Sequence, residues 1–138
     1  AQRYQSLGID IETVKEQLLK VNNLALENKP ADMVITSHIC RGNYHSTYFT
    51  SGAYDPVADY VFARENVDAL LLEYDDERSG GFEPLAKVSS DKKVVLGLIT
   101  TKSPKLENKE DVIDRDHCGS VGSRLAAICP YSIRHRGD

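Results

Sequence analysis

The stretch that decides the fold reads Met33-Val-Ile-Thr-Ser-His38-Ile-Cys40-Arg-Gly-Asn43. Its apolar beginning predicts a β-strand over Met33 to Ser37, and Gly42 marks a loop. Residues two apart on a strand point to the same face. If the strand continues to Cys40, His38 and Cys40 therefore present an imidazole and a thiol side by side, and both groups are ligands for zinc. The sequence thus predicts a candidate metal site at a strand end, where parallel α/β folds usually carry their chemistry.

The rest of the chain alternates helices and strands around this stretch. Asp10 is expected to cap a helix with one inward apolar stripe, made by Ile11, Val14, Leu18, Val21 and Ala25. Alternation of this kind predicts an α/β fold with a parallel sheet. The continuous apolar runs predict strands that are covered on both faces. The further expected elements are a helix from Asp55-Pro56, a strand over Val67 to Tyr74, a short helix over Pro84 to Lys87, a strand over Lys93 to Thr100 and a helix from Lys109.

Composition limits the function classes. The chain has 138 residues, which allows one domain at most, and its formal net charge is −4 with both signs interspersed. No basic patch predicts a nucleic-acid partner, and no long apolar or lysine-rich segment predicts a membrane partner. The 3 irregularly spaced cysteines suit a reducing compartment, so we expect a cytoplasmic protein. Because the chain opens on Ala1 and not on Met, we expect it to be a fragment.

Glu73 supplies a third donor at the end of the second strand. A carboxylate after three leucines needs a partner, because charged side chains are rarely buried alone. Neighbouring parallel strands would bring Glu73 to the same edge as His38 and Cys40, which makes a nitrogen, sulfur and oxygen set. Simpler interpretations stay open: a hydrogen-bonded loop histidine, a buried cysteine, and a glutamate paired with Arg41 or Arg78.

Two other polar groups follow strand ends. An acidic stretch could bind a hard cation, although an exposed acidic loop is the simpler interpretation: Asp75, Asp76 and Glu77. A second group ends the third strand and could contact a ligand or simply begin a loop: Thr100, Thr101 and Lys102.

Taken in order, these motifs resemble a known family. Ser37 to Asn43, Asp68 to Gly80 with Phe82 to Leu85, and Lys93 to Lys102 resemble the catalytic, C-terminal half of cobalamin-independent methionine synthase. The resemblance is closer to the shorter, stand-alone methionine synthase-like proteins of bacteria, and it spans roughly Gln2 to Arg115. It implies a (β/α)8 TIM-type barrel, of which this chain would supply about three βα units from the C-terminal half.

The resemblance also implies a zinc-dependent activity. The family's zinc ligands match His38, Cys40 and Glu73, and Asn43, Asp75 and Thr101 are expected to support them. A fourth ligand, a cysteine in an S-P-x-C-G motif, has no match, so the candidates for the fourth position are Cys118, Cys129 or a water molecule. The implied reaction is that of 5-methyltetrahydropteroyltriglutamate–homocysteine S-methyltransferase, in which a methylated folate donates its methyl group to a zinc-bound thiol during methionine biosynthesis. The acceptor would be homocysteine or a similar thiol.

The end of the chain departs from this pattern. We expect residues 1–115 to form the partial barrel and residues 116–138 to form a tail that is out of frame or disordered, because Gly119 and Gly122 should cut off the last helix. The alternative function is then a non-catalytic, truncated or frameshifted βα fragment. Such a fragment would be inactive alone and would self-associate or pair with another chain through exposed sheet edges.

Overall fold

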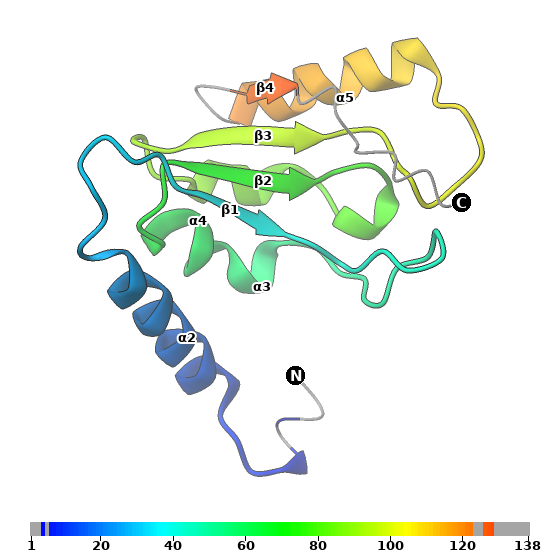
Figure 1. Ribbon diagram of the computed structural model, residues 1–138. Helices are drawn as coiled ribbons and strands as arrows, with labels where there is room; N and C mark the ends of the chain where they lie inside the picture. The colour runs from blue at the N-terminus through cyan, green and yellow to red at the C-terminus, as the bar shows by residue number, and fades with distance from the viewer. Residues whose placement is uncertain (1–3, 5, 123–125, 129–138) are drawn as a thin grey trace.

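A parallel β-sheet forms the centre of the structure, a computed structural model that describes residues 4, 6–122 and 126–128 (Figure 1). Its 4 strands lie in the order β1-β2-β3-β4, so neighbours in space are also successive in the sequence. All three pairings are parallel. The α/β class and the parallel sheet predicted from the sequence are confirmed. The strands are β1 (Thr36–Ile39), β2 (Ala69–Glu73), β3 (Lys93–Gly97) and β4 (Ala126–Ile128).

The helices begin where the sequence predicts. Asp10 caps α2, because its carboxylate accepts hydrogen bonds from the backbone N–H groups of Glu12 and Thr13. Pro56 lies in the first turn of α3, where its missing N–H costs nothing. None of the described helices is long and apolar enough to cross a membrane. The helical elements are α2 (Ile11–Leu26), α3 (Asp55–Ala58), α4 (Val61–Arg64), the 3-10 turns η1 (Glu77–Ser79) and η2 (Glu83–Lys87), and α5 (Lys109–Gly122).

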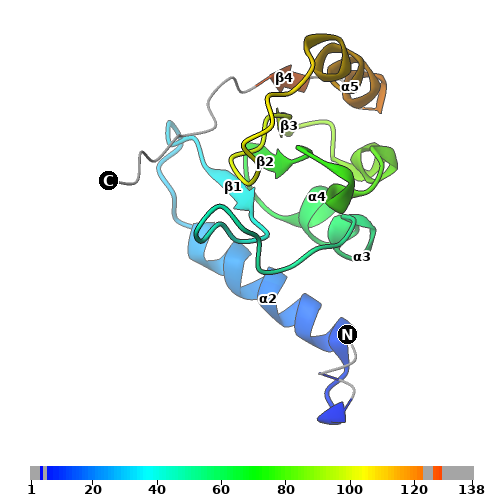
Figure 2. The same ribbon diagram turned by 90° about the vertical axis from the view of Figure 1, so that its right-hand side faces the viewer.

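One face of the sheet carries the hydrophobic core. Alternate residues of β2 and β3 point to this face, as the period of a strand requires. They pack against the helical layer, and Leu26 of α2 and Val112 of α5 reach the same core. Figure 2, which looks at the molecule from one end, shows α3, α4 and α5 on one side of the strands. The most buried members of the core are Tyr54, Ala58, Phe62, Leu70, Tyr74, Leu85, Val94, Leu96 and Leu98.

The opposite face of the sheet, the open face, is not covered by any of the described helices (Figure 2). Leu71 and Val95 point to it and are only partly buried, and His38 on β1 is exposed. Of the two covering layers expected for these strands, the described part of the chain shows one. The apolar run of β2 is continuous because Leu71, on the open face, lies between Leu70 and Leu72, which enter the core. Such a run therefore does not by itself indicate a second helical layer.

The prediction that one apolar stripe of α2 faces inward is wrong for Leu18 and Val21. Leu18 and Val21 are 59% and 61% exposed, whereas Leu19 is 7% exposed. The helix contacts the chain around α4 largely through polar groups. Arg64 donates to Glu16 at 2.6 Å, and the backbone N–H of Asn66 donates to the Asn23 amide oxygen at 2.8 Å. These polar contacts determine which face of α2 packs inward, and the spacing of its apolar residues does not predict them.

Two predicted boundaries are also shifted. The first strand covers Thr36–Ile39 and so begins three residues later than predicted, with Met33 and Val34 exposed before it. At the other end, α5 continues through Gly119 and ends at Gly122, so the prediction that Gly119 interrupts it is wrong. A glycine inside a helix costs about 1 kcal/mol but leaves the backbone hydrogen bonds intact. Within the predicted tail, Ala126–Ile128 forms β4, and Cys129 lies outside the described residues.

The two adjacent leucines of α2 provide a matched test of this helix orientation. Leu19→Ala is expected to lower the free energy of unfolding by about 2 kcal/mol, because it removes a buried side chain. Leu18→Ala should change it by less than about 0.5 kcal/mol, because the side chain is largely in water. Urea denaturation of both variants measures the difference. A larger loss at Leu18 would show that α2 presents its other face to the rest of the molecule.

Candidate metal centre

Three metal-binding side chains meet at the carboxyl-terminal edge of β1 and β2. One donor atom each from His38, Cys40 and Glu73 lies within 4.8 Å of the other two. The register explains this: His38 pairs with Leu71, so a continuation of two residues on each strand sets Cys40 beside Glu73. All three side chains therefore point to the open face of the sheet. The structure brings together the set that the sequence predicts.

The spacing of the donors suits a tetrahedral cation. Cys40 Sγ lies 3.7 Å from Glu73 Oε1. Zinc–ligand bonds of about 2.0–2.3 Å place neighbouring ligands of a tetrahedron about 3.3–3.8 Å apart. His38 Nδ1 lies 3.0 Å from the carbonyl oxygen of Leu71, and a proton on Nδ1 leaves the Nε2 lone pair for a metal. A backbone carbonyl that orients a histidine in this way is a common support for a metal ligand.

Backbone N–H groups hold the other two donors. The N–H of Arg41 donates to Glu73 Oε2 at 3.2 Å, and the N–H of Gly42 donates to Cys40 Sγ at 3.1 Å. Gly42 has φ +91°, and a Cβ here would lie 2.9 Å from the Cβ of Phe49. Only glycine fits this backbone comfortably. These two hydrogen bonds hold the sulfur of Cys40 and the carboxylate of Glu73 in place.

Four hydrogen bonds fix the main chain of Glu73. Its N–H donates to the hydroxyl of Tyr54 at 2.8 Å. Its carbonyl oxygen accepts from Tyr54 at 3.1 Å, Ser79 at 2.6 Å and Arg41 Nη1 at 3.3 Å. Tyr54 is 1% exposed, and this burial raises the pKa of its hydroxyl, which stays neutral and serves as donor and acceptor. The last residue of β2 is therefore held in one position.

The simpler interpretations are resolved in part. His38 has the hydrogen bond expected of a structural histidine, but Cys40 is exposed and is not a buried apolar residue. Arg41 Nη1 is 3.9 Å from Glu73 Oε2. Arg78 pairs instead with Asp75 and Asp76.

Sequence reasoning missed the closest cation to Glu73. The ammonium of Lys102 lies 3.2 Å from Glu73 Oε1, and the Lys102 side chain is 8% exposed. The sequence placed Lys102 among residues that could contact a ligand, but gave no signal for this ion pair. Asn43, expected to support the ligands, donates from its amide to the hydroxyl of Thr101 at 2.7 Å.

The remaining candidates lie elsewhere. Among the described residues, Asp75, Asp76 and Glu77 do not form a metal-binding group, because Arg78 already neutralises the first two. Cys118 is exposed on α5 and is not part of the group around Glu73. Cys129, the other candidate for the fourth ligand, lies outside the described residues.

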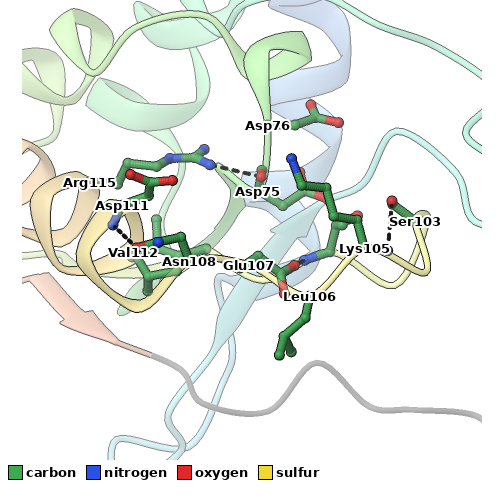
Figure 3. Close-up of a pocket in the computed structure, with 12 residues that line it drawn as sticks. Asp75, Asp76, Ser103, Lys105, Leu106, Glu107, Asn108, Asp111, Val112 and Arg115 are labelled. Carbon is green, nitrogen blue, oxygen red and sulfur yellow. Dashed lines mark hydrogen bonds between the residues drawn. The ribbon is translucent and has the colours of Figure 1, made fainter.

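A cavity of about 880 Å³ adjoins this edge of the sheet. Figure 3 shows Arg115 reaching from α5 toward Asp75, and its guanidinium donates to the Asp75 carbonyl oxygen at 2.8 Å. Lys105, Leu106 and Glu107 line it from the loop after β3. Its lining includes Asp75, two residues after Glu73, but none of the three donor residues. No periodic pattern marked this cavity in the sequence, because a loop supplies much of its wall.

Two curated proteins of Bacillus subtilis (strain 168) are similar to this chain. The uncharacterized protein YxjH is 50% identical over 126 residues, which are 91% of this chain and 33% of that protein. The uncharacterized protein YxjG is 45% identical over 126 residues, with the same shares of 91% and 33%. The chain thus spans about a third of the length of these curated relatives. No family model and no solved structure matches the chain.

Removal of the Tyr54 hydroxyl tests the support of Glu73. Tyr54→Phe should lower the free energy of unfolding by about 1–3 kcal/mol, because the N–H of Glu73 and the guanidinium of Arg41 lose a buried partner. Tyr60→Phe is the matched control, since its hydroxyl contacts Glu12 on the outside of the molecule. Guanidinium denaturation gives both values. Equal stabilities for the two variants would contradict the assignment of Tyr54 as a support.

Proposed function

We propose that this chain carries the zinc-binding part of an S-methyltransferase that moves a methyl group from a methylated folate to a thiol, as in cobalamin-independent methionine synthase. The observation that carries the proposal is the meeting of His38, Cys40 and Glu73 on the open face of the sheet. A nitrogen, sulfur and carboxylate set is typical of zinc. The order of the motifs around these residues supports the family assignment.

The fold supports a barrel segment. The strands follow one another in sequence order, all are parallel, and the core lies on one face of the sheet. A (β/α)8 barrel has this arrangement, with its helices outside and its catalytic groups at the carboxyl ends of the strands. In such a barrel the open face of this sheet would line the interior. The chain would then contribute one part of the closed structure, with about a third of the length of its relatives.

Each residue of the group has a defined task in this proposal. His38, Cys40 and Glu73 would hold the metal, and the backbone N–H groups of Arg41 and Gly42 keep two of these donors in place. When bound, zinc supplies a Lewis acid that keeps a coordinated substrate thiol as a thiolate near neutral pH. During the transfer the sulfur–methyl bond would form as the bond between the methyl group and the donor nitrogen breaks, and the released nitrogen would take up a proton.

Zinc content of the purified chain tests the metal centre. We expect close to one zinc per chain by elemental analysis, and a large decrease in Cys40→Ser, which replaces a soft thiolate by a hydroxyl. Cys118→Ser is the matched control, because Cys118 is also exposed but lies outside the donor group. Absence of zinc from the unmodified chain would contradict the metal centre. A loss in Cys118→Ser would instead make Cys118 the fourth ligand.

Methyl transfer is the second measurement. The zinc-loaded chain should form methionine from homocysteine and a methylated folate, and Cys40→Ser should not.

A second candidate function is a non-catalytic segment that acts only in association. It is favoured by the open sheet face and by the exposed apolar side chains of α2, including Leu18, Val21 and Leu24. Exposed apolar patches and strand edges promote association. In this case the chain binds zinc without turnover.

Sedimentation velocity tests this candidate. The chain should sediment as a dimer or larger species at micromolar concentration, and the double variant Leu18→Glu/Val21→Glu should shift it toward the monomer. A monomer for the unmodified chain would contradict association.

A further inference from the structure

Lys102 occupies an unusual position for a lysine beside a metal-binding group. It follows β3 by five residues, and its side chain is 8% exposed. Its ammonium lies between two carboxylates, 3.2 Å from Glu73 Oε1 and 3.6 Å from Asp75 Oδ2. A buried ammonium needs such partners, because desolvation is costly for an isolated charge. Lys102 is therefore tied to both carboxylates.

The ammonium contacts the oxygen that a metal would use. Glu73 Oε2 is engaged by the backbone N–H of Arg41 at 3.2 Å. Glu73 Oε1 is the oxygen that faces Cys40, with its distance of 3.7 Å to the sulfur. Both the ammonium and a divalent cation would thus bind Oε1. The ammonium of Lys102 and a metal ion bound to the same carboxylate oxygen would repel each other strongly in a partly buried site.

Asp75 offers Lys102 another place to bind. The Asp75 side chain is 4% exposed, and its Oδ2 accepts from Arg78 at 3.0 Å. Its Oδ1 makes no hydrogen bond of good geometry in the described part of the chain, although the side chain of Thr100 lies close to this carboxylate. A buried carboxylate oxygen without a partner can accept a donor at little cost. A small movement of the ammonium away from Glu73 would therefore reach an available acceptor.

We propose that Lys102 is the exchangeable counter-cation of the metal centre, which neutralises Glu73 in the metal-free chain and moves to Asp75 when the metal binds. The inference rests on the metal centre of the proposed function. Lys102 is a positioning residue in this scheme, since it acts through Glu73 and Asp75. Its charge sets the affinity of the site, because a metal must displace the ammonium before it can bind Oε1.

The test measures zinc affinity by competition with a chromophoric chelator. Lys102→Met removes the competing charge and should tighten zinc binding by about tenfold or more. Lys102→Arg keeps the charge and should bind with an affinity close to that of the unmodified chain. Lys87→Met is the matched control, because Lys87 forms an exposed ion pair with Asp59 away from the site. Its zinc affinity should not change.

A double-mutant cycle isolates the exchange between the carboxylates. Asp75→Asn should weaken zinc binding about tenfold in the unmodified chain, because Lys102 then has only Glu73 as an anionic partner. In the Lys102→Met background the same substitution should cost less than about threefold. Thermal melting of each variant without metal identifies any that fail to fold. Tighter binding by Lys102→Met cannot itself result from unfolding.

The outcomes separate this inference from the proposed function. Equal affinities for the unmodified chain and Lys102→Met would overturn the role of Lys102 and leave the metal centre intact. An equal effect of Asp75→Asn in both backgrounds would mean that Asp75 acts only as a distant charge, which would overturn the exchange. Absence of zinc binding in every variant would overturn the metal centre and this inference together.

Discussion

The hydrogen bonds to the main chain of Glu73 are the constraint on which the site depends. Tyr54, Arg41 and Ser79 reach this residue from three separate segments of the chain. Together they fix the last residue of β2, where a strand would otherwise fray. Because the Tyr54 hydroxyl is both donor and acceptor here, one buried side chain satisfies both backbone groups of Glu73. The direction of the Glu73 carboxylate follows from this arrangement.

One face of the sheet forms the hydrophobic core, and the other carries the candidate metal ligands. Leu70 and Leu72 of β2 enter the core, and Leu71 and Glu73 point to the open face. This alternation means that the ligands are not part of the packed core. A slip of one residue in the register would exchange the two faces and place Glu73 among apolar side chains. The core leucines therefore also protect the position of the donor group.

Much of the donor group could be predicted from the sequence, because strand alternation and parallel pairing are local rules. Those rules place His38, Cys40 and Glu73 at one edge with no knowledge of the rest of the molecule. The face of α2 could not be predicted, since Leu18 and Leu19 are identical in type and only tertiary contacts choose between them. Lys102 could not be assigned either, because a loop without a periodic pattern brings it to Glu73. The length of α5 does not follow from glycine propensity, because a glycine costs a helix about 1 kcal/mol but leaves its backbone hydrogen bonds intact.

Arg41 also closes the loop that follows the donor group. Its guanidinium donates to the carbonyl oxygen of Gly52 at 2.8 Å, and its own carbonyl oxygen accepts from Phe49 and Thr50. The segment between Arg41 and Gly52 therefore leaves the sheet and returns to nearly the same point. The entropy of closing such a loop grows slowly, by about 0.6 kcal/mol for each doubling of its length. In the course of evolution the part of this segment between Gly42 and Phe49 can lengthen, shorten or change its side chains while the strands and α3 keep their places, so the surroundings of the site can diversify at small cost to the fold.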